Sequence, residues 1–312
     1  MRRNITGIVI VLLFIIMLVS PKAVFTGASE GLLLWFQIIL PTLFPFLLIS
    51  NLLLVTGNIH YISSALGNLF SRMFSVSANG SFAVINGFLC GYPMGAKTAA
   101  DLSENGYVSK KEGQYLLSFC NNTSPVFILN FIVWKTLKED SLLLPTLLIL
   151  IISPVIVSFF TRRKYLRKGE HFQDQKSAAR TKQKWSFQDI DDCIINSFET
   201  LVKVGGYIIL FSVILTLLQT LPISIPVVTY ILPVLEVTNG IVMLGSMELP
   251  FIIKYPAILA LTSFGGLCAA AQTQCMIQNA KFPILPYITE KLAAAMTASM
   301  LGIAYLLLFH IV

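Results

Sequence analysis

The sequence predicts an all-α membrane protein that crosses the bilayer several times. Of its 312 residues, 55% are hydrophobic and only 12% are charged, whereas roughly a quarter of the residues of an average soluble domain are charged. Several windows of about 20 residues carry almost no charge, and a helix of that length crosses a hydrocarbon core of about 30 Å. The apolar runs lack the alternation of a β-barrel, so the spans are expected to be helices.

The first apolar window covers residues 4–20 and follows Arg2 and Arg3. A secretory signal peptide has the same basic start, and TGAS at 26–29 resembles a weak cleavage site. The length of the apolar run and the membrane character of the rest of the chain favour a retained helix.

The second window, residues 31–55, contains Pro41 and Pro45, which are predicted to kink the helix. Residues 57–80 then place apolar side chains at helical spacing around Arg72 and several polar residues. This pattern predicts an amphipathic helix at the membrane interface.

Residues 88–97, FLCGYPMGAK, interrupt the next apolar region. Gly91, Pro93 and Gly95 stop a helix, and the backbone groups left unpaired at membrane depth must be buried in protein or line a cavity. Helix N-termini at such a cavity favour anions, and Lys97 would add a positive charge. The alternative is a hairpin tip at the membrane surface, with Lys97 reaching to water.

Residues 114–134 are long enough to span but carry the polar sequence NNTSP at 121–125, whereas 141–160 form a cleaner span. Residues 162–184 then contain nine Lys or Arg and two Asp or Glu, an excess of seven positive charges that equals the formal net charge of +7 of the whole chain. The positive-inside rule places this segment in the cytoplasm. The N-terminus is predicted on the same side. The basic segment lacks the stacking aromatics of a nucleic-acid site.

The second half of the chain repeats the pattern of the first. Its candidate spans include two with polar or glycine-rich centres, LEVTNG at 235–240 and GGLCAAAQTQ at 265–274. Gly91 and Thr123 are 32 residues apart, and Thr238 and Cys268 are 30 apart. Paired interruptions are the best sequence pointer to a transporter site, so we expect two inverted repeats, each with a re-entrant hairpin and a broken helix. The candidate spans are 196–221, 227–245, 255–277 and 287–312.

The predicted organisation has four parts. They are an N-terminal transmembrane helix and linker (1–30), a first repeat (31–161), a basic cytoplasmic linker (162–190) and a second repeat (191–312). The four interrupted stretches are expected to meet around one cavity near the bilayer midplane, because each must be shielded from lipid at that depth.

NGFLCGYPMGAKTAADL and LLSFCNNTSPVFI, together with LEVTNG and SFGGLCAAAQTQ, resemble sequences of the nucleoside-recognition (Gate) domain membrane proteins. Within that group the chain is most similar to the sporulation integral membrane proteins of the YlbJ type. The resemblance implies a fold similar to that of concentrative nucleoside transporters, arranged as two Gate-like repeats. It also implies a bacterial cell membrane, or a membrane surrounding the forespore, and movement of dipicolinic acid into the developing spore.

Twelve residues are predicted to bind substrate. The motifs of the resembling family fall on Gly91, Tyr92, Gly95, Lys97, Asn121, Asn122, Ser124, Glu236, Thr238 and Asn239. Gln272 and Gln274 are added because amides donate and accept, as do Asn121, Asn122 and Asn239, which suits a nucleobase or a ring carboxylate. The alternative for each amide is a hydrogen bond between helices.

Glu236 is the strongest single candidate, because an ionisable residue in an apolar span is costly and marks a functional site. It is expected to bind a coupling proton or cation, or to pair with Lys97. The alternative is a carboxylate near the membrane interface.

No catalytic motif, metal-ligand spacing or cofactor signature is present, and the five cysteines lack a CxxC pair. We expect a transporter without enzymatic activity, metal or cofactor, whose partners are a small molecule and the bilayer. A carrier of nucleosides or other small metabolites and a non-transporting assembly protein needed for sporulation remain alternatives, and homo-oligomerisation stays open.

Overall fold

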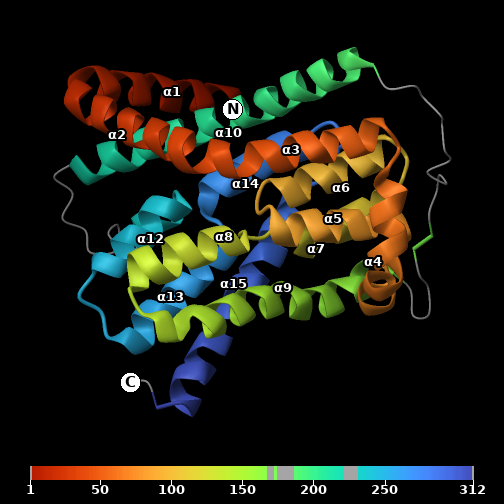
Figure 1. The fold of residues 1–312 in the computed structure, drawn as a ribbon. Coiled ribbons are helices and arrows are strands. Elements are labelled where there is room, and N and C mark those ends of the chain that lie inside the picture. Colours follow the sequence, from red (N-terminus) through yellow and green to blue (C-terminus); the bar gives the residue numbers. More distant parts are fainter. Residues whose placement is uncertain (1, 167–171, 174–185, 221–230, 311–312) are drawn as a thin grey trace.

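The computed structural model describes residues 2–166, 172–173, 186–220 and 231–310. This part of the chain is helical, without β-strands (Figure 1). Six of its helical segments are long and apolar enough to cross a membrane, and they correspond to six of the eight predicted spans. They are Pro21–Val55, Lys110–Leu137, Asp140–Tyr165, Phe187–Thr220, Phe251–Ile277 and Ile284–Leu308. The predicted spans 4–20 and 227–245 are represented only by shorter apolar helices among the described residues.

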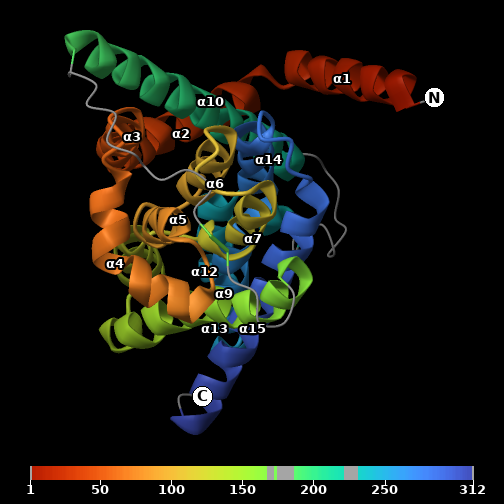
Figure 2. The same cartoon turned by 90° about the vertical axis from the view of Figure 1, so that its right-hand side faces the viewer.

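The predicted first helix is α1 (Arg2–Val19), which stands away from the other helices (Figure 2). The expected linker up to residue 30 is instead helical. Helix α2 (Pro21–Leu34) begins at once, with proline at the position where its missing N–H costs nothing. It continues through the π-helical turn η1 (Trp35–Ile39) into α3 (Leu40–Val55).

The amphipathic helix predicted after α3 is α4 (Ile59–Phe74), which lies across one end of the bundle (Figures 1 and 2). The interrupted region follows as short helices. Serine side chains accept hydrogen bonds from first-turn N–H groups of three of these helices, which satisfies donors that a helix start leaves free. The elements are α5 (Ala78–Leu89), α6 (Met94–Glu104), α7 (Lys110–Cys120), α8 (Pro125–Phe127), η2 (Ile128–Leu137), η3 (Asp140–Leu142) and α9 (Leu143–Tyr165).

The second half also contains two interrupted elements. The candidate span 227–245 lies partly outside the described residues, and its described part is broken at Leu235 and Glu236. The span 255–277 is two helices that meet at Gly265. The elements are α10 (Phe187–Thr220), η4 (Leu232–Val234), α12 (Val237–Ser246), α13 (Phe251–Phe264), α14 (Gly266–Ile277) and α15 (Ile284–Leu308).

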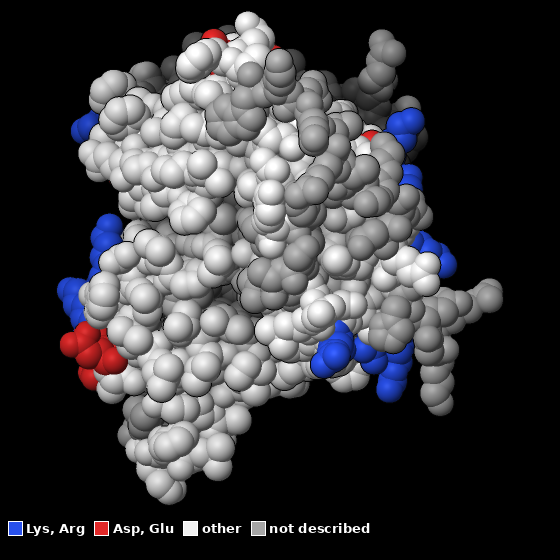
Figure 3. All heavy atoms as spheres, turned by 45° about the vertical axis from the view of Figure 1, so that its right-hand side comes forward, with Lys and Arg blue, Asp and Glu red and all other residues white. Residues whose placement is uncertain are grey.

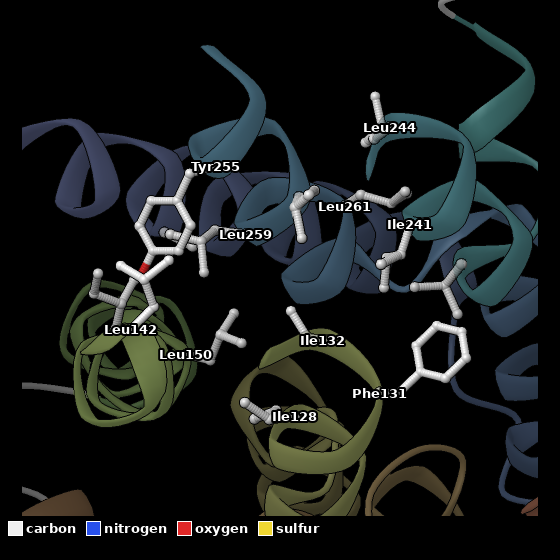
Figure 4. Close-up of a cluster of buried hydrophobic side chains, with 14 of the residues drawn as sticks. Ile128, Phe131, Ile132, Leu142, Leu150, Ile241, Leu244, Tyr255, Leu259 and Leu261 are labelled. Carbon is white, nitrogen blue, oxygen red and sulfur yellow. The ribbon is translucent and has the colours of Figure 1, made fainter. Parts of the chain in front are cut away.

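A large apolar core joins the two halves (Figure 4). Ile132 of η2 and Leu150 of α9 face Ile241 of α12 and Leu259 of α13, and all four are buried. Between α9 and α13, the hydroxyl groups of Thr146 and Tyr255 are hydrogen-bonded at 3.0 Å. The halves therefore form one body with a shared interior.

The surface of the bundle is apolar where a bilayer would surround it. Phe160, Leu285 and Met300 are each more than 60% exposed. On the face in Figure 3 the charged side chains of the described residues lie mostly toward the left and right edges, and the described side chains between them are mostly uncharged. Most of the basic segment 162–184 lies outside the described residues.

Candidate functional site

A cavity of about 250 Å³ lies where the four interrupted stretches meet. Each stretch contributes to its wall, and side chains of η1, α3, α10 and η2 complete it. Most of these are apolar, but Thr42, Asn130 and Lys135 are polar or charged. The residues from the interruptions are Gly91 and Tyr92, Thr123 and Ser124, Glu236 to Thr238, and Cys268, Ala269 and Gln272. The sequence prediction that these stretches meet is confirmed.

The first two interruptions are held against each other by backbone contacts. Gly91 has a φ of +88°, and a Cβ at this position would lie 2.9 Å from the amide nitrogen of Ser124. The N–H of Ala96, in the first turn of α6, donates to Oδ1 of Asn121 at 3.3 Å. The hairpin formed by α5 and α6 therefore packs on the break between α7 and α8.

The second half joins its two interruptions in a similar way. Gly265 and Gly266 have φ values of +89° and +77°, which only glycine adopts readily, and they separate α13 from α14. The N–H of Cys268 then donates to the main-chain oxygen of Leu235 at 2.9 Å. The break in the second broken helix therefore lies against the break before α12.

Glu236 is the acidic group of the cavity wall and is 3% exposed. Its carboxylate accepts hydrogen bonds from the N–H groups of Thr238 at 3.0 Å and Asn239 at 2.8 Å, and so caps α12. A carboxylate at this position is stabilised by the free N–H groups and by the helix dipole. Nδ2 of Asn239 donates to Oγ of Ser212 on α10 at 3.3 Å.

The structure brings half of the predicted site residues to the cavity. Those on its wall are Gly91, Tyr92, Ser124, Glu236, Thr238 and Gln272. Gly95, Asn121, Asn122 and Asn239 support the interruptions without lining the cavity, and Gln274 is exposed.

Lys97 lies elsewhere, which corrects the expectation that it pairs with Glu236 across the cavity. Its Nζ is 2.9 Å from a carboxylate oxygen of Asp101, one turn later on α6. Both side chains line a second, polar cavity of about 340 Å³. The physical reason is local: α6 starts at Met94, and its i,i+4 spacing gives Lys97 a partner on its own helix.

Lys291 contacts the break at Asn121 but is not among the residues predicted from the sequence motifs. It is 2% exposed, and its Nζ donates to the main-chain oxygen of Asn121 at 2.9 Å. Nδ2 of Asn121 donates in turn to Oγ1 of Thr273 at 3.0 Å and to the hydroxyl of Tyr287 at 2.8 Å. The signal was present, since the Glu290–Lys291 pair interrupts the apolar span 287–312.

Glu290 joins the same helix to the end of α9. Its Oε1 accepts from Nζ of Lys164 at 2.8 Å and from the hydroxyl of Tyr165 at 3.0 Å. The adjacent residues Glu290 and Lys291 therefore anchor α15 to two elements of the first half.

The chain is 25% identical over 313 residues to the sporulation integral membrane protein YlbJ of Bacillus subtilis (strain 168). The alignment covers 89% of this chain and 76% of that protein. No family model and no solved structure matches the chain. The similarity supports the family of sporulation integral membrane proteins, and with the six apolar helices it makes this chain a multi-pass integral membrane protein.

Proposed function

We propose that this protein is a transporter that carries a small carboxylated aromatic molecule across a membrane of the sporulating cell, with dipicolinic acid as the substrate. The observation that carries the proposal is the cavity between the four interrupted stretches. Broken helices around a shared polar site are the usual construction of a secondary transporter.

The order and packing of the elements favour two inverted repeats. Each half contains a long helix, a broken helix and a final helix, and an interrupted element stands before each broken helix: the α5–α6 hairpin in the first half, and η4 with α12 among the described residues of the second. The hairpin helix α6 packs on α14 in the other half, and α12 packs on η2 in the same way. The pairs α7 with α9 and α13 with α15 also correspond. Such a relation places matching elements on opposite sides of one central site.

The chemistry of the wall suits a flat acid. The segments that begin at Pro125, Val237 and Gly266 all contribute to the cavity wall. N–H groups of their first turns already donate to Ser124, Glu236 and Leu235, so what they offer an anion is the positive end of the helix dipole. Gln272 and the hydroxyl groups of Thr123 and Ser124 offer donors and acceptors, while the apolar wall accommodates a ring.

Glu236 sets a condition on such a substrate. A carboxylate of the substrate and an ionised Glu236 would repel at short range in a site of low dielectric. The proposed transporter therefore binds the acid with a proton on Glu236, which makes this residue the coupling group.

Uptake of labelled dipicolinate into proteoliposomes tests the proposal. We expect uptake by the parent protein, a strong loss in Gln272→Ala and little change in Gln274→Ala, because only the first amide lines the cavity. If unlabelled nucleosides compete with this uptake, the substrate would instead be assigned to the nucleosides. Protein that remains monodisperse but takes up neither compound would contradict the proposal.

A further inference from the structure

The central cavity and the polar cavity lie along the same set of helices. On α10, Val204 lines the central cavity and Thr200, one turn earlier, lines the polar one. On α14, Gln272 lines the first and Cys275 the second. The same succession occurs along α3 and along the hairpin, from Gly91 to Lys97. The two cavities are therefore consecutive spaces between the same elements.

A compact apolar cluster occupies the position between them. Its members come from α3, the hairpin and α10, and each is at most 5% exposed. Leu43 and Cys90 also belong to the wall of the central cavity. We call this set the apolar barrier: Leu43, Leu47, Cys90, Met94 and Leu201.

The polar cavity has the character of a hydrated entrance. Its wall carries two ion pairs, Lys97 with Asp101 and Lys203 with Glu199, as well as several amide side chains. It lies between the later turns of α3 and the early turns of α10, toward the end of the bundle crossed by α4 (Figure 1). The basic segment connects to α9 and α10 at this end, which the positive-inside rule makes cytoplasmic.

We propose that the polar cavity is the cytoplasmic vestibule of the transport route. In this structure the apolar barrier separates the vestibule from the central cavity. The inference rests on the proposed transport function. A polar molecule in the vestibule would reach the central cavity only when α3 and α10 move apart from the hairpin, because five packed apolar side chains leave no polar path.

Two native cysteines, one in the vestibule and one in the barrier at its central-cavity face, allow a direct test. Cys275 lines the vestibule and Cys90 lines the central cavity. Single-cysteine proteins that retain one or the other are placed in sealed vesicles with the cytoplasmic side outward and treated with a membrane-impermeant thiol reagent. We expect Cys275 to react and Cys90 to stay protected.

Opening the barrier should expose Cys90. Leu201→Ala removes a fully buried barrier side chain, and we expect labelling of Cys90 to become about tenfold faster because the closed packing is weakened. Leu215→Ala removes a buried leucine of the same helix outside the barrier and should leave Cys90 protected. Leu47→Ala serves as a second barrier variant, and an unchanged rate at Cys275 shows that the fold is retained.

The outcomes separate this inference from the proposed function. Equal labelling of Cys90 and Cys275 in the parent would overturn the barrier, even if dipicolinate is transported. Protection of Cys90 that is lost in neither barrier variant would also overturn it. Labelling as expected without uptake of dipicolinate or nucleosides would support the barrier and contradict the proposed transport.

Discussion

Nζ of Lys291 lies 2.9 Å from the main-chain oxygen of Asn121. The contact joins the last helix of the second half to the residue at which the first broken helix is interrupted. A carbonyl group freed by such a break needs a donor when water is absent. The amino group of Lys291 supplies this donor from a distance of 170 residues along the chain.

Replacing Lys291 with methionine should therefore destabilise the protein. The side chain keeps a similar length, but the oxygen of Asn121 loses its donor, and an unsatisfied buried group costs about 1–3 kcal/mol. Relief of the buried amine from desolvation opposes this loss, so we expect a net cost near the lower figure. Thermal unfolding followed by size-exclusion chromatography measures it.

The matched control is Lys203→Met. Lys203 pairs with Glu199 on an exposed surface of α10, where an ion pair contributes little. A Lys291→Met protein as stable as this control would show that Asn121 finds another partner.

The sequence predicted the interruptions better than their surroundings. Gly, Pro and Asn are unfavourable in a helix interior, so clusters of them made the breaks near Gly91, Asn122, Glu236 and Gly265 visible in the chain itself. The partner of Asn121 was not, because Lys291 reaches it only through the packing of α15 on α7. Tertiary contacts of this kind leave no local pattern.

Two misplaced expectations have local causes. The predicted linker filled the interval between the apolar windows 4–20 and 31–55, and the structure has α2 there, which begins with proline at the start of the helix. Lys97 was assigned to the cavity by its proximity to the break. The side chain of Lys97 instead pairs with Asp101, which lies one turn later on the same helix, α6.

Glu236→Gln should flatten the dependence of dipicolinate uptake on pH. Glutamine keeps one of the two oxygens that accept from the N–H groups of Thr238 and Asn239, and it cannot gain or lose the proton that the proposed mechanism requires. The initial uptake rate measured from pH 5 to pH 8 gives the profile. Glu248→Gln, at an exposed position beyond α12, should keep the parent profile. A Glu236→Gln profile as steep as that of the parent would exclude Glu236 as the coupling group.

Lys97→Gln should lower the stability of the folded protein, and the loss should be greatest at neutral pH. Burial raises the pKa of Asp101, and the positive charge of Lys97 opposes that rise. Without Lys97 the pKa rises further, and a carboxyl group with a raised pKa in the folded state loses its stabilising contribution as pH increases through that value. The decrease in unfolding temperature relative to the parent should therefore shrink as the pH is lowered and Asp101 becomes protonated.

The double variant Lys97→Gln/Asp101→Asn tests whether the loss of stability in Lys97→Gln comes from leaving the carboxylate of Asp101 without its partner. It removes both charges, so the unpaired carboxylate is absent and stability at neutral pH should return toward that of the parent. Lower dipicolinate uptake in both variants, at normal abundance, would indicate that Lys97 itself attracts the acid. A double variant as unstable as Lys97→Gln alone would show that Asp101 is not the cause of the weakness.

Gly95→Ala should disrupt the contact between the hairpin and the first broken helix. A Cβ at Gly95 would collide with the main-chain oxygen of Cys120, at the end of α7, and a backbone atom cannot move aside as a side chain can. Overpacking of this kind costs about 1–3 kcal/mol. Gly206→Ala is the matched control, because within the described part of the chain, apart from its own helix backbone, its added methyl group meets no atom within 4 Å, and alanine favours the helix interior. We expect Gly95→Ala to lower the unfolding temperature and the abundance of folded protein, and Gly206→Ala to leave both unchanged or raise them slightly. If the two variants unfold at the same temperature, α6 does not pack on α7 as closely as the structure has it, and the cavity wall at Gly91 and Ser124 would lose its support.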